Sequence, residues 1–412
     1  MEKTLKMFNL HQRKVIYVTD NGSNIVKACD LAKADRIGCV AHALHNLITV
    51  DGIAKTASVS DVVLLCKDIV KTFIYKTSLL EEESEAMVQE KLLAELDCEG
   101  YASEVMTIEY GEPDEPGSGF SATTLKKECP TRWNSLLKML DSLCANQTLI
   151  ERCLSRLRLF EKIPTDEQWS TIRDIAQFLQ LFNQATEILS GASYSTSALV
   201  LLFKSEICRV LSPSDGDPHI LEEFKSNMRT RIDYRIPIHD VHVCAVMLDP
   251  AQRHLSAVQE FLDNKGVTAV DFLEQMIDKF ASDDKLQEGT SVECEESTAG
   301  PSWKKAKIDL LSKHSDVACS SRNREIQQFR CLSVASDDLL EWWKQQSGTF
   351  PRLSRLARSI LAVPATSTPS ERVFSIAGLT LLAKRSSLAP HNVSKIIFVH
   401  DNDGCVRVTG DD

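Results

Sequence analysis

The chain has 412 residues, 43% of them hydrophobic and 25% charged, a composition typical of a globular protein of two or three domains. Its formal net charge is -11, which excludes a protein that grips nucleic acid over its whole surface, because such proteins are basic. No apolar run approaches the roughly 18 to 20 residues of a membrane span, and the N-terminus has no apolar signal core. We therefore expect a soluble intracellular protein without a membrane partner.

The first candidate chemistry is a strand that ends in a carboxylate. In "KVIYVTDNGSNIVKACDLA", residues 15–19 predict a buried strand, Asp20 ends it, and residues 25–31 predict a helix. Residues 37–40 begin a second strand and helix, so this segment predicts part of an α/β sheet. Sites of open α/β sheets gather at this edge, where Asp20 can bind Mg²⁺. On local pattern alone, a turn residue that caps the next helix explains Asp20 better.

Cys39 and His42 form a C-x2-H motif, and His45 follows three positions later. The 13 cysteines of the chain are scattered, and none forms a C-x2-C pair. A structural zinc site needs four ligands, so we expect no zinc site in this chain. An odd, unpatterned set of cysteines predicts reduced thiols and a cytosolic or nuclear protein. For His42, contact with phosphate and an ordinary structural role both remain open.

Periodic apolar residues predict helices over most of residues 59–97 and 132–280. Within the second range, Thr165 and Gln168 form a capping box at the start of a helix. Residues 283–333 are polar and poor in apolar side chains, so they predict a disordered linker.

Two groups of side chains are candidates for contact with nucleic acid. Arg132 and Trp133 stand just before a helix, where arginine can bind phosphate and tryptophan can stack on an unpaired base. The alternative is a tryptophan buried in the core beside a solvated arginine. Arg352, Arg355 and Arg358 share one face of a predicted helix. They can follow a phosphate backbone or simply form a solvated surface.

"PATSTPSERVFS", residues 364–375, has the pattern of a helix start. Thr368 is predicted as the N-cap, Pro369 as the first helical residue, and Glu371 as the third, which completes a capping box. Taken alone, this pattern assigns Glu371 a structural role. The buried face of the helix is predicted to carry Val373, Phe374, Ala377 and Leu381.

The segments around this motif are also helical in pattern. Trp342 and Trp343 are adjacent and therefore point in different directions, which is compatible with an interdomain or dimer contact or with core packing. Residues 353–361 predict an amphipathic helix. A last helix carries Val393, Ile396 and Ile397.

The order of these motifs is more specific than any one of them. "VTDNGSNIVKA", "CVAHALHNL", "CPTRWNSLLKML", "MLDP" and "PATSTPSERVFSIAG" follow one another in a chain that resembles the hAT superfamily of DNA transposases. It most resembles the transposase-derived, BED-type zinc finger proteins. The resemblance covers about residues 10–402, and its final block resembles the hAT C-terminal dimerisation region.

The resemblance implies a metal-dependent site for DNA phosphodiester hydrolysis and strand transfer, in which three carboxylates hold two divalent cations. Asp20 matches the second carboxylate and Glu371 the third. Cys39 and His42 match the family's C-x2-H motif. Trp133, with Arg132 beside it, matches an aromatic residue that supports a flipped-out base.

The resemblance also implies an α/β plus α fold, in which an incomplete RNase H-like domain is interrupted by an all-helical insertion domain and completed by a helical C-terminal dimerisation region. The expected boundaries are 1–145 and 334–402 for the RNase H-like parts, 146–282 for the insertion and 283–333 for the linker. The strand with the family's first catalytic Asp and the N-terminal finger are expected to precede Met1. Mg²⁺ binding by Asp20 and Glu371 alone is therefore expected to be weak.

The leading hypothesis is a catalytically inactive, transposase-derived nuclear protein that dimerises through its C-terminal region and associates with DNA as a regulator. One alternative is an active transposase of which this chain is a fragment, and another is a protein-interaction scaffold with no DNA role. The candidate DNA contacts are His42, Arg132, Trp133, Arg352 and Arg355. The candidate dimer contacts are Trp342, Trp343, Leu356, Ile360, Phe374, Ile396 and Ile397.

Overall fold

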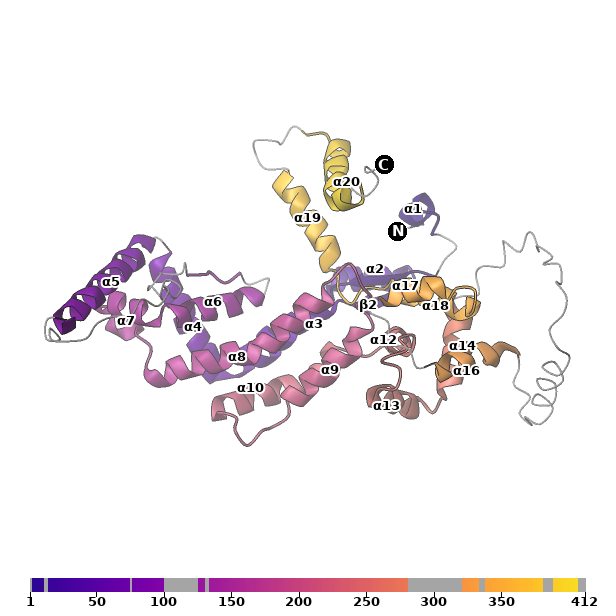
Figure 1. Ribbon diagram of the computed structural model, residues 1–412, viewed down its shortest axis with the longest axis horizontal. Coiled ribbons are helices and arrows are strands. Elements are labelled where there is room, and N and C mark those ends of the chain that lie inside the picture. Colours follow the sequence, from indigo (N-terminus) through magenta and orange to yellow (C-terminus); the bar gives the residue numbers. More distant parts are fainter. Residues whose placement is uncertain are drawn as a thin grey trace, which may run out of the picture. The chain divides into compact units, whose positions relative to one another are not determined.

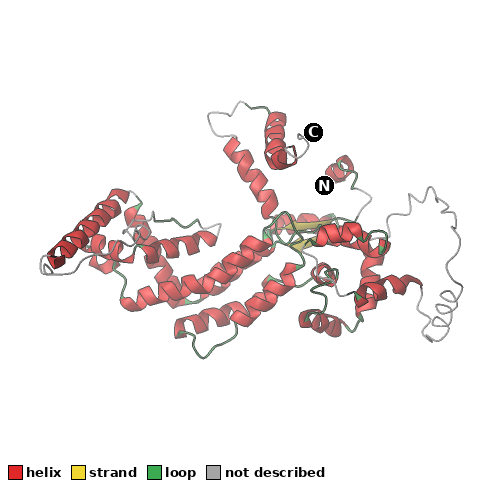
Figure 2. Ribbon diagram, viewed as in Figure 1, coloured by secondary structure: helices red, strands yellow, loops and turns green. Residues whose placement is uncertain are grey.

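The computed structural model describes most of the chain. The described ranges are 2–10, 14–74, 76–99, 125–129, 133–280, 321–332, 338–380 and 388–406. These residues are mostly helical, with one small sheet (Figure 2). None of their helices is long and apolar enough to cross a membrane.

The chain divides into two compact units, and Figure 1 labels most of their helices. Unit 1 consists of residues 1–42, 186–206 and 236–412, and unit 2 of residues 43–185 and 207–235. These boundaries differ from the expected insertion at 146–282. The helical unit already begins at Ala43, and residues 236–280 belong to unit 1. Three helices have residues in both units: α3 (Val40–Asn46), α8 (Asp166–Leu189) and α9 (Leu199–Val210).

The sheet of unit 1 is a single parallel pair. β1 (Ile16–Thr19) and β2 (Asp35–Gly38) run in register from Ile16 opposite Asp35 to Thr19 opposite Gly38, and α2 (Ser23–Leu31) connects them. Such a connection is the usual one between parallel strands. Both predicted strands are confirmed to within two residues at their ends. The RNase H-like architecture of the whole remains an expectation.

The other elements of unit 1 are helices. They are α1 (Glu2–Met7), α12 (Asp240–Met247), α13 (Ser256–Lys265), α14 (Ala269–Phe280), α16 (Ser321–Cys331), α17 (Leu339–Gln345), α18 (Pro351–Ile360), α19 (Thr368–Thr380) and α20 (Pro390–Val406).

Helix α16 corrects part of the predicted linker. Residues 321–331 form a helix in which Ile326 and Phe329, three positions apart on one face, are fully buried. The polar composition concealed this pair, because two apolar side chains are enough to anchor a short helix on an existing core. The rest of the range 283–333, except Leu332, lies outside the described residues.

Phe329 lies at the centre of an aromatic cluster in the core of unit 1. Its ring centroid is 5.2 Å from that of Trp343 and 6.0 Å from that of Phe350. The Trp343 indole N–H donates to the carbonyl of Leu248 over 2.9 Å. Both the apolar bulk and the polar tip of Trp343 are therefore used inside the chain.

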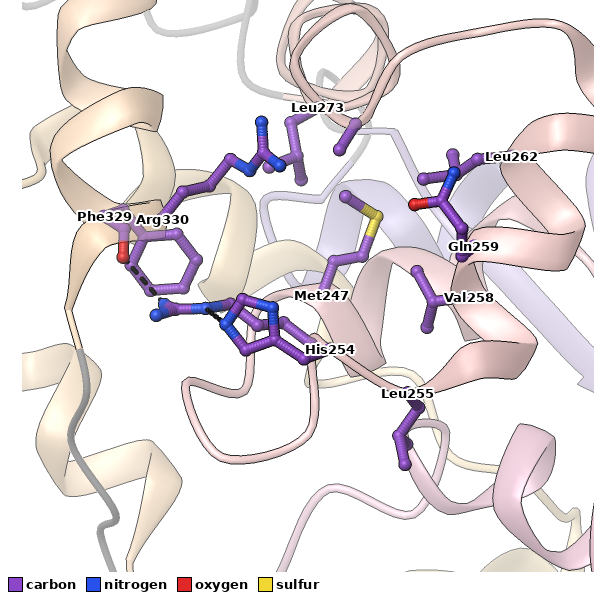
Figure 3. A pocket seen from close by; sticks show the side chains of 11 residues that line it. Met247, His254, Leu255, Val258, Gln259, Leu262, Leu273, Phe329 and Arg330 are labelled. Carbon is purple, nitrogen blue, oxygen red and sulfur yellow. Dashed lines mark hydrogen bonds between the residues drawn. The ribbon is translucent and has the colours of Figure 1, made fainter.

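A cavity of about 250 Å³ lies beside this cluster (Figure 3). It is lined by side chains from α12, α13, α14 and α16, such as Met247 and Phe329, and from the segment between α12 and α13, such as His254. Arg253 reaches across from the segment after α12 and donates to the backbone carbonyls of Phe329, over 2.7 Å, and Leu332. Arg253 thus fastens α16 to the core, and its guanidinium is committed to this contact.

Unit 2 has only helices as secondary-structure elements in its described part, and its residues 125–129 are not helical. Apart from the shared helices it contains η1 (Leu47–Gly52), η2 (Ile53–Lys55), α4 (Ala57–Phe73), α5 (Thr77–Glu99), α6 (Asn134–Ala145), α7 (Gln147–Arg156), η3 (Phe160–Lys162), α10 (His219–Arg229) and α11 (Ile232–Arg235). The predicted capping box before α8 is confirmed, because the backbone N–H of Thr165 donates to Gln168 and that of Gln168 donates to Thr165.

Candidate functional site

The candidate site of unit 1 lies where the sheet ends and α3 begins. Cys39 follows β2 directly, and its backbone N–H donates to the carbonyl of Thr19, the last residue of β1, over 2.7 Å. The next N–H, that of Val40, donates to the carbonyl of Ala365 over 3.0 Å. The segment before α19 is thereby held against the carboxyl ends of the two strands.

This segment continues towards α19 along Cys39. The backbone N–H of Ala365 donates to the hydroxyl of Thr196 over 2.8 Å, and that of Ser367 donates to the thiol sulfur of Cys39 over 3.2 Å. Cys39 and Ala365 are both buried. The fold thus joins two sequence motifs, C-x2-H and "PATSTPSERVFS", by backbone hydrogen bonds.

Glu371 lies in the first turn of α19 and faces His42. Its Oε1 accepts a hydrogen bond from the Ser367 hydroxyl over 3.0 Å and lies 3.9 Å from His42 Nδ1. The second distance permits electrostatic attraction but is too long for a hydrogen bond. The predicted capping box between Thr368 and Glu371 is wrong. Helix α19 already begins at Thr368, and Glu371 contacts the side chain of the preceding residue, Ser367.

The electrostatics of Cys39 and His42 are coupled. Burial alone would raise the pKa of the Cys39 thiol, but hydrogen bonds from His42 and Ser367 outweigh burial and lower it. Hydrogen bonding to Cys39 raises the pKa of His42 against the opposing effect of burial, and the charges of Cys39, Glu371 and Asp20 raise it further. Cys39 and His42 therefore each make the charged form of the other easier to reach.

Asp20 combines the turn role that its local pattern favours with a place near His42. Its Oδ1 accepts from the backbone N–H of Gly22 over 3.2 Å, and Arg36 donates to its backbone carbonyl over 3.1 Å. Because its charge also raises the pKa of His42, carboxylates from both ends of the chain act on one imidazole.

These donors do not make a complete metal centre. Within the described ranges, no three His, Cys, Asp or Glu side chains are grouped so that they could hold a metal ion. A magnesium ion can be held by one or two carboxylates together with water, so Asp20 and Glu371 fit at most an open, weak site of that kind.

The other described residues proposed to contact DNA, Trp133, Arg352 and Arg355, have different surroundings from those of His42. Trp133 is 3% exposed in the core of unit 2, which is the alternative that the sequence left open and which corrects its expected role as an accessible stacking surface. Arg132 lies outside the described residues. Arg352 makes a two-pronged contact with the carboxylate of Glu274, at 2.7 and 3.1 Å, so its charge is already engaged. Arg355 is exposed.

The candidate dimer contacts divide into two groups. Trp342, Trp343, Leu356 and Ile360 are buried in the core of unit 1, with exposed fractions of 8% or less. This corrects the expectation that they face a partner, since their apolar surface is used within the chain. Phe374 and Ile396 are exposed, at 74% and 41%, and Ile397 is half-buried.

The prediction that Phe374 lies on the buried face of α19 is also wrong. Phe374 was expected to pack inside the chain, whereas its ring is largely in solvent; Val373 and Ala377 are half-buried, and Leu381 lies outside the described residues. Sequence reasoning also missed Ser367, which contacts both Cys39 and Glu371, and Thr196, whose hydroxyl accepts a hydrogen bond from Ala365. No local pattern connects residues so far apart in the chain.

Comparisons with known proteins agree with the order of the motifs. The hAT family C-terminal dimerisation region matches residues 324–402. The chain is 24% identical over 301 residues to a putative AC transposase of Zea mays, which covers 66% of this chain and 36% of that protein. It is 25% identical over 312 residues to the zinc finger BED domain-containing protein RICESLEEPER 2 of Oryza sativa subsp. japonica, covering 68% and 43%.

A third relative is the transposable element Hobo transposase of Drosophila melanogaster, 23% identical over 297 residues that cover 61% of this chain and 45% of that protein. The chain therefore spans less than half the length of these relatives.

Proposed function

Because this chain is a distant relative of the hAT family transposases and carries their C-terminal dimerisation region, we propose that it self-associates through α19 and α20. We further propose that the assembly acts in the nucleus as a DNA-associated regulator. Self-association is the part on which the structure offers most support.

The observation that carries this proposal is an uncovered apolar surface at the end of the matched region. Phe374 on α19 is 74% exposed, and Phe398 and Val399 on α20 are 68% and 62% exposed. Burying one such side chain fully contributes about 1.5–3 kcal/mol. Exposed apolar side chains on neighbouring helices are typical of interaction surfaces, and α19 and α20 contact each other.

The earlier part of the matched region has a different role. Its large apolar side chains, such as Trp343, Leu356 and Ile360, are buried in the core of unit 1. The first helices of the matched region thus belong to the core of unit 1, whereas its last two helices, α19 and α20, are partly uncovered. We place the subunit contact on α19 and α20 for this reason.

The test is the molar mass of the full chain, measured by sedimentation at several concentrations. We expect a dimer that Phe398→Asp weakens at least tenfold, because a buried carboxylate replaces an apolar ring. Phe160→Asp is the matched control: Phe160 is 63% exposed but lies in unit 2. A wild-type chain that stays monomeric, or two variants that behave alike, would refute self-association at this surface.

DNA association is proposed from the relatives that are named as transposases. The net charge of -11 requires that any contact use local cationic patches. Anisotropy of labelled duplex DNA, measured over a range of salt concentrations, tests this. Binding that weakens as salt rises supports it, and absence of binding at low salt favours the interaction scaffold.

One observation favours a second candidate, metal-dependent cleavage of DNA. The charges of Asp20 and Glu371 both raise the pKa of the His42 imidazole, which supports a site shared by the two carboxylates. Mg²⁺-dependent cleavage of a terminal-repeat substrate, lost in Asp20→Asn, would support this candidate. Equal activity of Asp20→Asn and the unaltered chain would dismiss it.

A further inference from the structure

Helices α17 and α18 of unit 1 enclose a groove of about 750 Å³. Its apolar lining comes from Leu340, Trp343, Pro351, Ala357, Leu361 and Ala362. Leu340 remains 44% exposed although it lines the groove. The exposed apolar surface of the groove comes from Leu340, Pro351 and Ala362, whereas Trp343, Ala357 and Leu361 are at most 4% exposed.

The rim of the groove is basic. Lys344, Arg355 and Arg358 line it, and no carboxylate is among its lining residues. Lys344 is paired with Glu341, whereas Arg355 and Arg358 form no ion pair within the described ranges. Ser354, which also lines the groove, has a buried hydroxyl oxygen without a hydrogen-bond partner in the same part of the chain. An occupant with apolar side chains and a carboxylate would complement these features.

Helix α20 has this combination. Ile396, Phe398 and Val399 are exposed on it, and Asp401 follows Phe398 by three positions, which is one helical turn. The Asp401 side chain is 39% exposed and hydrogen-bonded only to its neighbour His400 among its described contacts. In one chain α20 contacts α19 and contributes no residue to the groove. Groove and helix both lie within residues 324–402, the matched dimerisation region.

We propose that α20 of one protomer docks in the α17–α18 groove of its partner. Phe398 and Val399 fill the apolar floor, and Asp401 pairs with Arg355 or Arg358 on the rim. This inference rests on the proposed self-association and specifies how it occurs. The contact is reciprocal, so two copies related by a two-fold axis fill both grooves and leave neither helix exposed.

The experiment uses two variants of the full chain and their mixture. Ala362→Trp blocks the groove, and Ala362 is exposed, so the core is not disturbed. Phe398→Asp disables the helix. Each variant alone is expected to dimerise at least tenfold more weakly than the unaltered chain. An equimolar mixture regains a heterodimer, because the intact α20 of one variant meets the intact groove of the other.

The outcomes separate this inference from the proposed function. If Phe398→Asp is monomeric while Ala362→Trp dimerises like the unaltered chain, α19 and α20 meet face to face and the groove contact is refuted. If both variants are monomeric and the mixture stays monomeric, reciprocal docking is refuted as well. If the unaltered chain is a monomer, both proposals fail together.

A charge exchange provides a second measurement that leaves the apolar contacts intact. Arg355→Asp with Arg358→Asp is expected to weaken the dimer, and adding Asp401→Arg to the same chain should restore it. If the two arginine substitutions reduce DNA binding while dimerisation is unchanged, the groove serves nucleic acid and the proposed docking is overturned.

Discussion

His42 Nδ1 lies 3.9 Å from Glu371 Oε1, although the two residues come from opposite ends of the chain. The approach is fixed by backbone contacts: Val40 bonds to Ala365, and Ser367 bonds to the Cys39 thiol. The first turns of α3 and α19 are therefore tied together beside the sheet. The two side chains are 38% and 44% exposed, but His42 Nδ1 itself is buried and has no hydrogen-bond partner among the described residues.

Removing the charge of Glu371 should lower the pKa of His42. Glu371→Gln is expected to lower it more than Asp20→Asn does, since Glu371 makes the larger electrostatic contribution of the two. Titration of the His42 ring signals by NMR measures both shifts. Glu341→Gln, which removes an exposed carboxylate paired with Lys344, is the control and should leave the pKa of His42 unchanged.

The raised pKa of His42 also makes stability depend on pH. A raised folded-state pKa contributes stability that is fully present below the unfolded value of about 6.5 and is lost as pH rises through the folded value. The unaltered chain should therefore lose more unfolding free energy than His42→Asn as pH rises above about 6.5. Parallel urea midpoints for the two chains across this range would contradict the assignment.

The fold was predictable from sequence where the signal is local. The β-branched run before Asp20 predicted β1, and Thr165 with Gln168 predicted the start of α8. The contact between Cys39 and Ser367 was not predictable from spacing, because nothing in either local pattern refers to the other. Only the resemblance to a family suggested that Asp20 and Glu371 approach one another.

Apolar residues posed a different problem, since periodicity does not say which apolar face finds a partner. Phe374 and Leu356 both occupy apolar positions in helical patterns, yet Phe374 is exposed and Leu356 is buried. The difference arises from the helices around α18, which cover Leu356 within the same chain. Arg352 was misjudged similarly, because its partner Glu274 is far away in sequence.

Arg352 should stabilise unit 1. Its guanidinium bonds to both carboxylate oxygens of Glu274, and both side chains are largely buried. We expect Arg352→Ala to lower the unfolding free energy by about 1–3 kcal/mol, because Glu274 loses a charged hydrogen-bond partner. Arg355→Ala, one turn further on and exposed, should cost less than about 0.5 kcal/mol. Equal urea midpoints for the two variants would show that the ion pair contributes nothing.

Trp343 should be more sensitive than its neighbour to replacement by phenylalanine. Its indole N–H donates to the buried carbonyl of Leu248, whereas Trp342 packs against Phe329 and Trp343 through its ring. Trp343→Phe is expected to cost about 1–3 kcal/mol more than Trp342→Phe, since Leu248 is left unsatisfied. Thermal unfolding of both variants measures the difference, and a larger effect at Trp342 would contradict it.

Replacing the buried carboxylate of Asp51 should have a large effect on the stability of unit 2. Asp51 is 1% exposed, and it accepts hydrogen bonds from Lys55 over 3.1 Å and Arg235 over 2.5 Å, with Arg231 at 3.5 Å. Asp51→Asn should lower the unfolding free energy by about 3–5 kcal/mol, because it leaves the cations without their counter-charge. Asp61→Asn, an exposed position on α4, is the control and should change it by less than about 0.5 kcal/mol.

The pH dependence of the same residue has the opposite sign to that of His42. Burial alone would raise the pKa of Asp51, but hydrogen bonds from Arg235 and Lys55 outweigh burial and lower it. The resulting stability is present above the unfolded value of about 3.9 and is lost as pH falls through the folded value. The hydrogen-exchange protection factors of η1 and α10, which are corrected for the intrinsic exchange rate at each pH, should therefore fall with acid in the unaltered chain and much less in Asp51→Asn. An equal fall in both chains would place the acid-sensitive group elsewhere.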